Sequence, residues 1–411
     1  MTVHLASFLI LTLTAILAGP LLAAAMPSVL VNPHVHGNGT AKTIQEGITM
    51  VDPGGKVMVL PGTYNEALVI DKGLTLEAVG GAIGPVTIAS PGTATAVQVT
   101  TPEPVTIRDV TVLTGASGIR GDGIVDVTIE RVNVLSVNPP LGASFLVAVS
   151  NNAPTTGRAR LTVLESFLDG TVPPANSPTP AFPQVQGIRV QGDVDARLER
   201  NVIRRTGGAC IVVFMRNDFA GETNADILDN DLDECYPLGR LGSLVVQGQL
   251  VPPTPATAIG VMNIIGNTIR NTFQSCLPTT AIVQAFGTGR VERNQVLGVV
   301  QPCAVDLPTR TRGAIWIGSL LATAAPVSSV VRFNDIEGNA YAGLRVGRNI
   351  TTPLDARCNW WGSANGPSGI GPGTGDAVVL ESPAATPLFT PWAAAPIAET
   401  DETTCTGGSA E

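Results

Sequence analysis

A six-residue pattern of hydrophobic and polar positions recurs along most of the chain. An aliphatic residue is followed by two variable residues, then usually asparagine, one variable residue and a second aliphatic residue. The pattern reads VLESFL from Val163, LERNVI from Leu198, ILDNDL from Ile227, IIGNTI from Ile264, VERNQV from Val291 and VRFNDI from Val331. Including weaker copies at both ends, its fourth position holds Val110, Val132, Ser166, Asn201, Asn230, Asn267, Asn294, Asn334 and Asn359. A fixed motif at unequal intervals indicates a constant core interrupted by loops of variable length.

The pattern predicts stacked coils of short β-strands. Period-2 alternation buries one face of each strand, and a single coil cannot bury that face unless another coil covers it. Parallel stacking places equivalent residues above one another, about 4.8 Å apart. An inward asparagine tolerates the left-handed turn conformation, and its amide can hydrogen-bond the asparagine of the next coil. We therefore expect an all-β, single-stranded parallel β-helix of about 9 to 11 coils with an inward asparagine ladder.

A shorter motif precedes several ladder copies and predicts a second strand in each coil. It reads GIRV from Gly187, CIVV from Cys210, AIVQ from Ala281, AIWI from Ala314 and GLRV from Gly343. The expected inward residues are Ile188, Ile211, Ile282, Ile315 and Leu344. The expected outward residues are Arg189, Phe214, Gln284, Trp316 and Arg345, with Asp193, Arg216 and Asp218 at the edge. Pro-rich stretches at 139–157, 170–183, 237–257 and 302–312 are expected to form loops beside these strands.

The repeat leaves no room for a domain boundary, and both open ends of a solenoid need caps. We assign residues 1–25 to a signal peptide, 26–54 to a leader and N-terminal cap, 55–362 to the β-helix, and 363–411 to a C-terminal cap with an acidic tail. Ile44, Ile48 and Val51 fall on one helical face, which suits a short capping helix over 43–51. The last coil is expected to be covered by Trp360, Trp361, Phe389, Pro391 and Trp392.

The N-terminal segment predicts export. An apolar run from Leu5 to Leu22 is followed by Ala23, Ala24 and Ala25, the small residues of a cleavage site. No Lys or Arg precedes the run, and the run approaches membrane-spanning length, so an uncleaved anchor is the alternative. The mature protein is expected to be secreted, periplasmic or on the cell surface. Once the signal is cleaved, we expect no membrane contact.

Composition narrows the classes of partner. Charged residues make up 14% of the chain and the mean hydropathy is +0.28, which argues against disorder. The formal net charge of −9 disfavours nucleic acid, because that binding needs cations to neutralise phosphates. We therefore expect a folded monomer without a nucleic-acid partner.

Six cysteines in an exported chain predict disulfides. Cys276 and Cys303 each follow a ladder asparagine by nine positions, which places them on adjacent coils within bridging distance. Cys210 lies two coils from Cys276, which is too far for a bridge, and its nearest candidate is one coil away. We expect the pairs Cys276–Cys303, Cys210–Cys235 and Cys358–Cys405. The sequence contains no CxxC motif, so neither a redox nor a zinc site is expected at these cysteines.

Charged residues also stack in columns. Three residues after the ladder position come Asp169, Arg204, Asp233, Arg270, Leu297 and Glu337, and one residue before it come Arg131, Glu165, Arg200, Asp229, Gly266 and Arg293. The signs alternate over four coils in both columns. Like charges at this spacing would repel, whereas opposite charges would fix the register. We interpret the columns as structural ion ladders. The alternative is a uronate groove in which arginine binds the carboxylate and aspartate handles the proton.

Two segments carry a family resemblance. PGTYNEALVIDKGLTLEAVGG from Pro61 resembles the first coils of the pectin-lyase-like superfamily, and CNWWGSANGPSGIGPGTGDAV from Cys358 resembles the closing segment of secreted bacterial β-helix repeat proteins. The resemblance covers about residues 55–392 and implies a right-handed β-helix. In many enzymes of this superfamily, the outward face of the strands with the shorter motif lines a saccharide cleft. The resemblance therefore implies substrate-binding roles for Arg189, Phe214, Arg216, Asp218, Trp316 and Arg345.

The superfamily mixes lyases, esterases, hydrolases, epimerases and proteins without activity, so the fold does not fix the function. This sequence shows no acidic calcium cluster of the pectate-lyase type, no QD-containing methylesterase motif and no Asp-Asp pair. His34 and His36 form an HxH pair without a third ligand, so no metal site is expected. We expect a non-catalytic exported protein that binds acidic polysaccharide of the cell envelope or the extracellular space. The alternative is a polysaccharide lyase, hydrolase or epimerase. No cofactor is expected, except calcium if the protein is a lyase.

Overall fold

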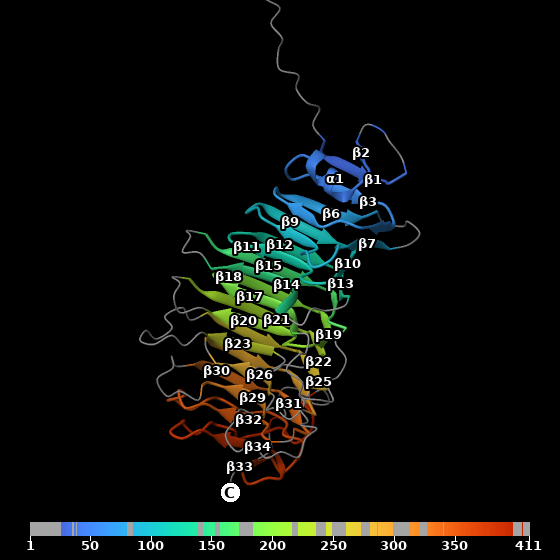
Figure 1. Ribbon diagram of the computed structural model, residues 1–411. Coiled ribbons are helices and arrows are strands. Elements are labelled where there is room, and N and C mark those ends of the chain that lie inside the picture. Colours follow the sequence, from blue (N-terminus) through green and yellow to red (C-terminus); the bar gives the residue numbers. More distant parts are fainter. Residues whose placement is uncertain are drawn as a thin grey trace, which may run out of the picture.

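The computed structural model shows three long parallel β-sheets wound into one elongated solenoid (Figure 1). It describes residues 26–34, 37, 39–79, 85–137, 143–152, 157–171, 184–215, 221–235, 244–248, 260–272, 280–285, 287–298, 313–319, 327–339, 341–397 and 405. The predicted signal peptide, His36 and most of the acidic tail lie outside these residues, so export stays an expectation. No helix of the described part is both long and apolar enough to cross a membrane.

The strands of each sheet come from successive turns of the chain. The first sheet contains β1 (Ser28–Val31), β2 (Thr40–Ala41), β3 (Lys56–Val59), β6 (Leu74–Ala78), β9 (Pro104–Arg108), β12 (Asp126–Glu130), β15 (Ala159–Leu164), β18 (Val194–Glu199), β21 (Thr223–Leu228), β24 (Val261–Ile265), β27 (Thr288–Glu292) and β30 (Ser328–Arg332). The second sheet contains β4 (Gly62–Tyr64), β7 (Val86–Ala89), β10 (Thr111–Thr114), β13 (Asn133–Ser136), β16 (Phe167–Asp169), β19 (Val202–Thr206), β22 (Asp231–Cys235), β25 (Thr268–Arg270), β28 (Gln295–Leu297) and β31 (Asp335–Glu337). The third sheet contains β5 (Leu68–Ile70), β8 (Val97–Val99), β11 (Ile119–Asp122), β14 (Ala143–Asn151), β17 (Gln184–Gly192), β20 (Ile211–Met215), β23 (Leu244–Gly248), β26 (Thr280–Gln284), β29 (Gly313–Ile317), β32 (Leu344–Val346), β33 (Pro367–Gly369) and β34 (Gly375–Leu380).

Ten successive strand triplets, from β3–β5 to β30–β32, each supply one strand to every sheet, so each triplet is one coil. The strands pair in parallel with equivalent residues aligned. For example, Val163 lies between Ile129 of the coil before and Leu198 of the coil after. All three are fully buried and form part of one continuous aliphatic core. The winding is right-handed, as expected for crossovers between parallel strands. The predicted fold class is therefore confirmed.

The predicted asparagine ladder lies at the turn between the first and second sheets. The backbone N–H and the side-chain Nδ2 of Asn201 both donate to Oδ1 of Asn230, at 3.0 and 2.9 Å. The same pair of bonds joins each later member to the next, through Asn267, Asn294, Asn334 and Asn359. On the other side of Asn201, the N–H of Ser166 donates to its Oδ1 at 3.0 Å. The predicted single inward stack is therefore confirmed, from Asn201 to Asn359.

One detail of the ladder differs from the sequence interpretation. The left-handed backbone conformation belongs to the residue before the asparagine, with φ of 53° at Arg200, 54° at Asp229 and 57° at Arg293. The asparagine must direct both its N–H and its amide toward the next coil, so the sharp turn is made one residue earlier. This position accepts charged residues because a left-handed turn costs a non-glycine residue only about 1 kcal/mol.

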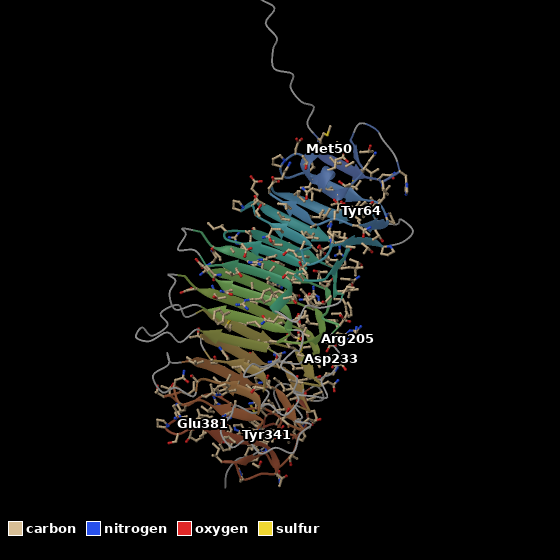
Figure 2. The ribbon with its side chains drawn as sticks, in the orientation of Figure 1. Met50, Tyr64, Arg205, Asp233, Tyr341 and Glu381 are labelled. Atoms are coloured by element: carbon tan, nitrogen blue, oxygen red, sulfur yellow. A yellow bond between two sulfur atoms is a disulfide. The ribbon has the colours of Figure 1, made fainter. Side chains whose placement is uncertain are left out.

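Both predicted charge columns are confirmed by strand register or by ion pairs. Asp169, Arg204, Asp233 and Arg270 are aligned neighbours on the second sheet. The two columns contain the ion pairs Arg204–Asp169 (3.1 Å), Arg270–Asp233 (3.4 Å), Arg131–Asp109 (2.8 Å) and Arg200–Glu165 (3.0 Å). Figure 2 labels Arg205 and Asp233 on the side of the molecule where this sheet lies. These charges pair with one another, which supports the structural reading of the columns.

The N-terminal end is capped by the helix α1 (Ile44–Met50). Thr43 is its N-cap and accepts a hydrogen bond from the backbone N–H of Glu46 at 3.1 Å. The Glu46 carboxylate in turn accepts from the N–H of Lys42 at 2.8 Å, which closes a capping box. Ile44 and Ile48 are fully buried against the first coil. The helix thus covers the open end of the core, as the sequence predicted.

The C-terminal end is covered by aromatic residues. Trp361 is fully buried, and Trp392 is 7% exposed with its indole N–H donating to the carbonyl of Ala364 at 3.1 Å. Phe389 packs against the core, whereas Trp360 is only half-buried and donates its N–H to Glu337 at 2.9 Å. The predicted aromatic cap is therefore present.

Two of the three predicted disulfides lie within the described part of the chain. Cys210 is bonded to Cys235, with Cα atoms 5.6 Å apart, and Cys358 to Cys405, with Cα atoms 5.2 Å apart. Both pairings are those predicted, Cys210–Cys235 from the proximity of their coils and Cys358–Cys405 as the remaining pair. Cys276 and Cys303 lie outside the described residues, so their bridge stays a prediction.

Candidate functional site

The third sheet carries one continuous outward column of positions along the solenoid. Its register runs through Arg120, Ala148, Arg189, Val212, Val245, Val283, Trp316 and Arg345. We call this set the outward column. Three of the predicted site residues, Arg189, Trp316 and Arg345, therefore share one line. Gly187 lies two residues before Arg189 in β17. Only glycine fits at this position, because a Cβ there would lie 2.3 Å from the carbonyl oxygen of Cys210 on the next coil.

Phe214 and Gln284 do not belong to this column. Phe214 is aligned with Gln191 and Gln247, two residues further along the strands, and stays outward. Gln284 is aligned with Ile317 on the inward side and is fully buried. The prediction of an outward Gln284 was wrong, because period-2 alternation puts it on the same side as the inward Ile282. Within the described part of the chain, neither polar atom of the Gln284 amide has a hydrogen-bond partner.

The outward column is less exposed than predicted over much of its length, since Ala148, Val212 and Val283 are 3%, 4% and 5% exposed. Trp316 is only 8% exposed, and the side chain of Arg345 is 12% exposed. The guanidinium of Arg345 lies 5.9 Å from the Trp316 ring centre and forms an ion pair with Glu381. Figure 2 labels Glu381 near the C-terminal end of the solenoid. The prediction of an exposed strand face is therefore wrong at Trp316 and Arg345, although both residues are outward in register.

Among the described residues, the indole N–H of Trp316 is a buried donor without an acceptor, as is that of Trp361. A buried N–H that makes no hydrogen bond destabilises a protein by about 1 to 3 kcal/mol. Native structures contain few such groups, and those that persist call for a specific explanation. Trp316 is therefore a candidate for a donor that meets a ligand oxygen.

Arg189 is the arginine of the outward column whose side chain contacts aromatic rings and a neutral amide. Its guanidinium lies 5.1 Å from the ring centre of Phe145 and 5.6 Å from that of Phe214. Its Nε donates to Oε1 of Gln191 at 2.9 Å, and its Nη2 donates to the same oxygen at 2.5 Å. The amide of Gln191 then donates to Oδ1 of Asn152 at 3.0 Å. The structure therefore holds this cation between two aromatic rings and against a neutral amide.

The charge on Arg189 is not balanced by a carboxylate among the described residues. Burial lowers the pKa of Arg189, and the nearby charge of Arg120 lowers it further. A guanidinium still remains protonated in water at neutral pH. A half-buried cation of this kind favours an anion from outside the chain.

Arg120 offers a comparison within the same column. It lies two strands from Arg189, with Ala148 between them. Its Nε is 2.8 Å from Oδ2 of Asp122, so its charge is neutralised within its own strand. Gln98, on the preceding strand, donates to the same carboxylate at 3.3 Å.

Of the three residues predicted at the edge of this face, the structure describes only Asp193. Asp193 accepts a bond from Arg158 at 2.8 Å, and Asp195 accepts another from the same side chain at 2.8 Å, so both are engaged in an ion network. Arg216 and Asp218 lie outside the described residues. No group of three His, Cys, Asp or Glu side chains in the described ranges is arranged to hold a metal ion.

A second candidate site is a cavity of about 470 Å³ at the C-terminal end of the second sheet, where its lining includes Leu297, Glu337 and Asp376. Burial raises the pKa of Asp376 above its ordinary value of 3.8, and Glu337 raises it as well. Hydrogen bonds from the backbone and side chain of Asn339, at 3.1 and 2.6 Å, act in the opposite direction. The cavity therefore contains one carboxyl group biased toward its protonated form.

Sequence reasoning missed Phe145, Asn152, Gln191 and Asp376. Phe145 lies in β14 and Asn152 directly follows it, within the Pro-rich stretch 139–157, so no repeat placed them. The prediction that the stretches 139–157 and 237–257 form loops was wrong where they contain β14 and β23. Gln191 could have been identified from the sequence, because it follows Arg189 by two positions, as Asp122 follows Arg120. Period 2 alone puts each pair on one face.

No protein-family model matches the sequence, and no curated protein matches it. Among solved structures, the chain is similar to the crystal structure of the Dettilon tailspike protein (gp208). The TM-score is 0.55 at 16% sequence identity, and the match covers 87% of this chain and 69% of that chain. The chain has a tailspike-like parallel β-helix fold. At this identity the likeness concerns the fold alone.

Proposed function

We propose that this protein is an exported β-helix that binds acidic polysaccharide of the cell envelope or the extracellular space and does not cleave it. The observation that carries the proposal is Arg189, a half-buried guanidinium without a carboxylate partner in the described part, set between Phe145 and Phe214. Arginine forks suit carboxylates, and aromatic faces suit the apolar faces of sugar rings.

The dimensions of the outward column support a polymeric ligand. Arg120 and Arg345 are separated by seven strand-to-strand steps, or about 34 Å at the usual spacing of parallel strands. A monosaccharide would contact only a small part of this line. A chain lying along the solenoid axis would contact this line mainly at Arg120 and Arg189, which are more accessible than Val212 and Val283.

The disulfides support export. Cys210–Cys235 and Cys358–Cys405 would persist in an oxidising compartment but not in a reducing cytosol. Together with the apolar N-terminal segment, they favour a location where extracellular polysaccharide is available.

The test is retention on a uronate-rich matrix compared with a neutral polysaccharide matrix. We expect the wild type to be retained on the uronate matrix and to elute at lower salt when Arg189 is replaced by alanine. The matched control is Arg160→Ala on the first sheet, an exposed arginine whose side chain is 70% accessible. Equal elution of the wild type and Arg189→Ala, or no retention of the wild type, would overturn the proposal.

The second candidate function is hydrolysis of a polysaccharide, and the cavity with Glu337 and Asp376 favours it. A carboxyl group with a raised pKa beside a second carboxyl group resembles the acid and its partner in a glycosidase. The acid would protonate the leaving oxygen while water adds to the sugar carbon. Release of reducing ends by the wild type, abolished in Asp376→Asn, would establish this function in place of simple binding.

A further inference from the structure

Two arginines of the outward column, Arg120 and Arg189, each bond the side chain two residues later in the strand. Only at Arg120 is that side chain a carboxylate. In β11 the sequence is Arg120-Gly121-Asp122, and in β17 it is Arg189-Val190-Gln191. In both strands the side chain of the arginine bonds the side chain two positions later. Aspartate takes this place beside Arg120, and a neutral amide takes it beside Arg189.

Gln191 performs the orienting role of a carboxylate without its charge. Its oxygen holds the Nε and Nη2 of Arg189, and its amide nitrogen is anchored on Asn152. Gln191 is 8% exposed, so its position is fixed by packing as well. The guanidinium is thereby oriented, but no carboxylate in the described ranges neutralises its positive charge.

The bonds to Gln191 leave one end of the guanidinium without a partner. Within the described residues, no acceptor bonds Nη1 of Arg189. The rings of Phe145 and Phe214 lie over the guanidinium and leave its edge as the place for a further acceptor. An oxyanion with two oxygens in one plane matches the two donors at this end.

We infer that the Arg189 edge is the receptor for one oxyanion group of the polysaccharide, a carboxylate or a sulfate, and that Gln191 is the positioning residue that makes it selective for charged over neutral sugars. This inference rests on the proposed function. Arg120 is not such a receptor, because Asp122 already occupies its fork. The charge of residue 191 thus decides whether the column binds an anion at this level.

The experiment uses the full chain and three small probes, glucuronate, glucose 6-sulfate and glucose, with affinity measured by calorimetry. We expect the wild type to bind one or both anionic sugars and to bind glucose at least about tenfold more weakly. Whichever anion binds identifies the oxyanion class. Gln191→Glu should weaken the binding of that anion at least about tenfold, since the new carboxylate neutralises the fork as Asp122 does at Arg120. Unchanged binding in Gln191→Glu would overturn the inference.

The matched control is Gln98→Glu, which adds the same charge to the same sheet. Gln98 lies three strand steps from Arg189, about 14 Å, beyond the screening length of about 8 Å at physiological salt. We expect it to bind the anion as the wild type does. If Gln191→Glu fails to fold, Asp122→Asn provides the reciprocal test, because freeing Arg120 should add anion binding. No gain in that variant would count against the inference.

The two proposals fail in different ways. A wild type that binds the anionic monosaccharide but is not retained on any acidic polymer would refute the proposed function and leave the receptor intact. A wild type that is retained on acidic polymer while Gln191→Glu elutes at the same salt would refute the receptor and leave the proposed function.

Discussion

The asparagine ladder and the outward column run along the same coils but treat polar groups in opposite ways. In the ladder, each buried amide from Asn201 to Asn334 donates to the next member, and the bonds are 2.9 to 3.0 Å long. In the outward column, the N–H of Trp316 has no acceptor among the residues that the structure describes, and Arg189 is held by an amide instead of an acid. The ladder amides form their hydrogen bonds with other groups of the chain, whereas the outward column contains donors that could bond a ligand.

Residues of the ladder therefore stabilise the fold, whereas Arg189 and Trp316 of the outward column lower its stability. A satisfied buried network fixes one register and makes each member costly to remove. An unpaired donor or an unbalanced cation lowers stability and persists mainly where function requires it. Substitutions in the two regions should therefore change stability in opposite directions.

The largest effect is expected in the ladder, from Asn267→Ala. Asn267 Oδ1 accepts two bonds from Asn230, and its Nδ2 donates to Asn294 and to the carbonyl of Ile227. Alanine would leave several buried groups without partners, so we expect a loss of about 3 kcal/mol or more in the free energy of unfolding, measured in urea.

The control is Asn133→Ala, an exposed asparagine with one long bond of 3.4 Å to Thr111, for which we expect a change under about 0.5 kcal/mol. Equal losses in the two variants would mean that the ladder bonds contribute little and would remove one side of the comparison.

The sequence was sufficient for the ladder side of this comparison. Repetition of one motif set the register, and register alone placed Asp169 beside Arg204 and Arg204 beside Asp233. These pairings needed only the strand-to-strand stacking of equivalent positions. They depend on no contact that loops create.

The sequence was not sufficient for the outward column. Strand parity can say that Trp316 is outward, but its exposure depends on what packs over it, which a repeat does not encode. Gln284 was misplaced because its polar side chain suggested the surface, whereas alternation put it inside. The significance of Gln191 appears only once its contact with Arg189 is known, because the sequence gives the spacing but not the bond.

Trp316→Phe should raise stability. Phenylalanine keeps an aromatic ring beneath Arg345 and removes a buried N–H that makes no hydrogen bond. We expect the free energy of unfolding to increase by about 1 kcal/mol. The matched control is Trp392→Phe, which removes an N–H bonded to Ala364 and should lower stability by about the same amount. Destabilisation in both variants would show that Trp316 is not an orphan donor.

Arg189→Met should also raise stability, by up to about 1 kcal/mol, because it removes an unbalanced cation and keeps an apolar side chain between two rings. Arg120→Met should not do so, since it would break the ion pair with Asp122. Thermal unfolding at low salt measures both effects. A loss of stability in Arg189→Met equal to that in Arg120→Met would mean that the neutral amide balances the cation as well as an acid does.

The smallest effect concerns pH and the C-terminal cavity. Burial and the charge of Glu337 raise the pKa of Asp376 in the folded chain above its ordinary value of 3.8. A carboxyl group whose pKa is raised by folding stabilises the fold fully below its unfolded pKa, and this contribution is lost as pH rises through the folded pKa. Asp376→Asn imitates the protonated form, so it should be more stable than the wild type at pH 7. That advantage should disappear as the pH falls below about 4.

Asp355→Asn is the control of opposite sign, because a hydrogen bond from Arg357 is the largest of the influences that lower the pKa of Asp355 below 3.8. Its carboxylate stabilises the fold above the unfolded pKa, and this contribution is lost as the pH falls through the folded pKa. Asp355→Asn should therefore be less stable than the wild type at pH 7, and the difference should narrow only under more acidic conditions. Urea unfolding of both variants between pH 3 and pH 7 measures the two trends. Parallel trends would contradict a raised pKa at Asp376, and with it the main support for hydrolysis as the second candidate function.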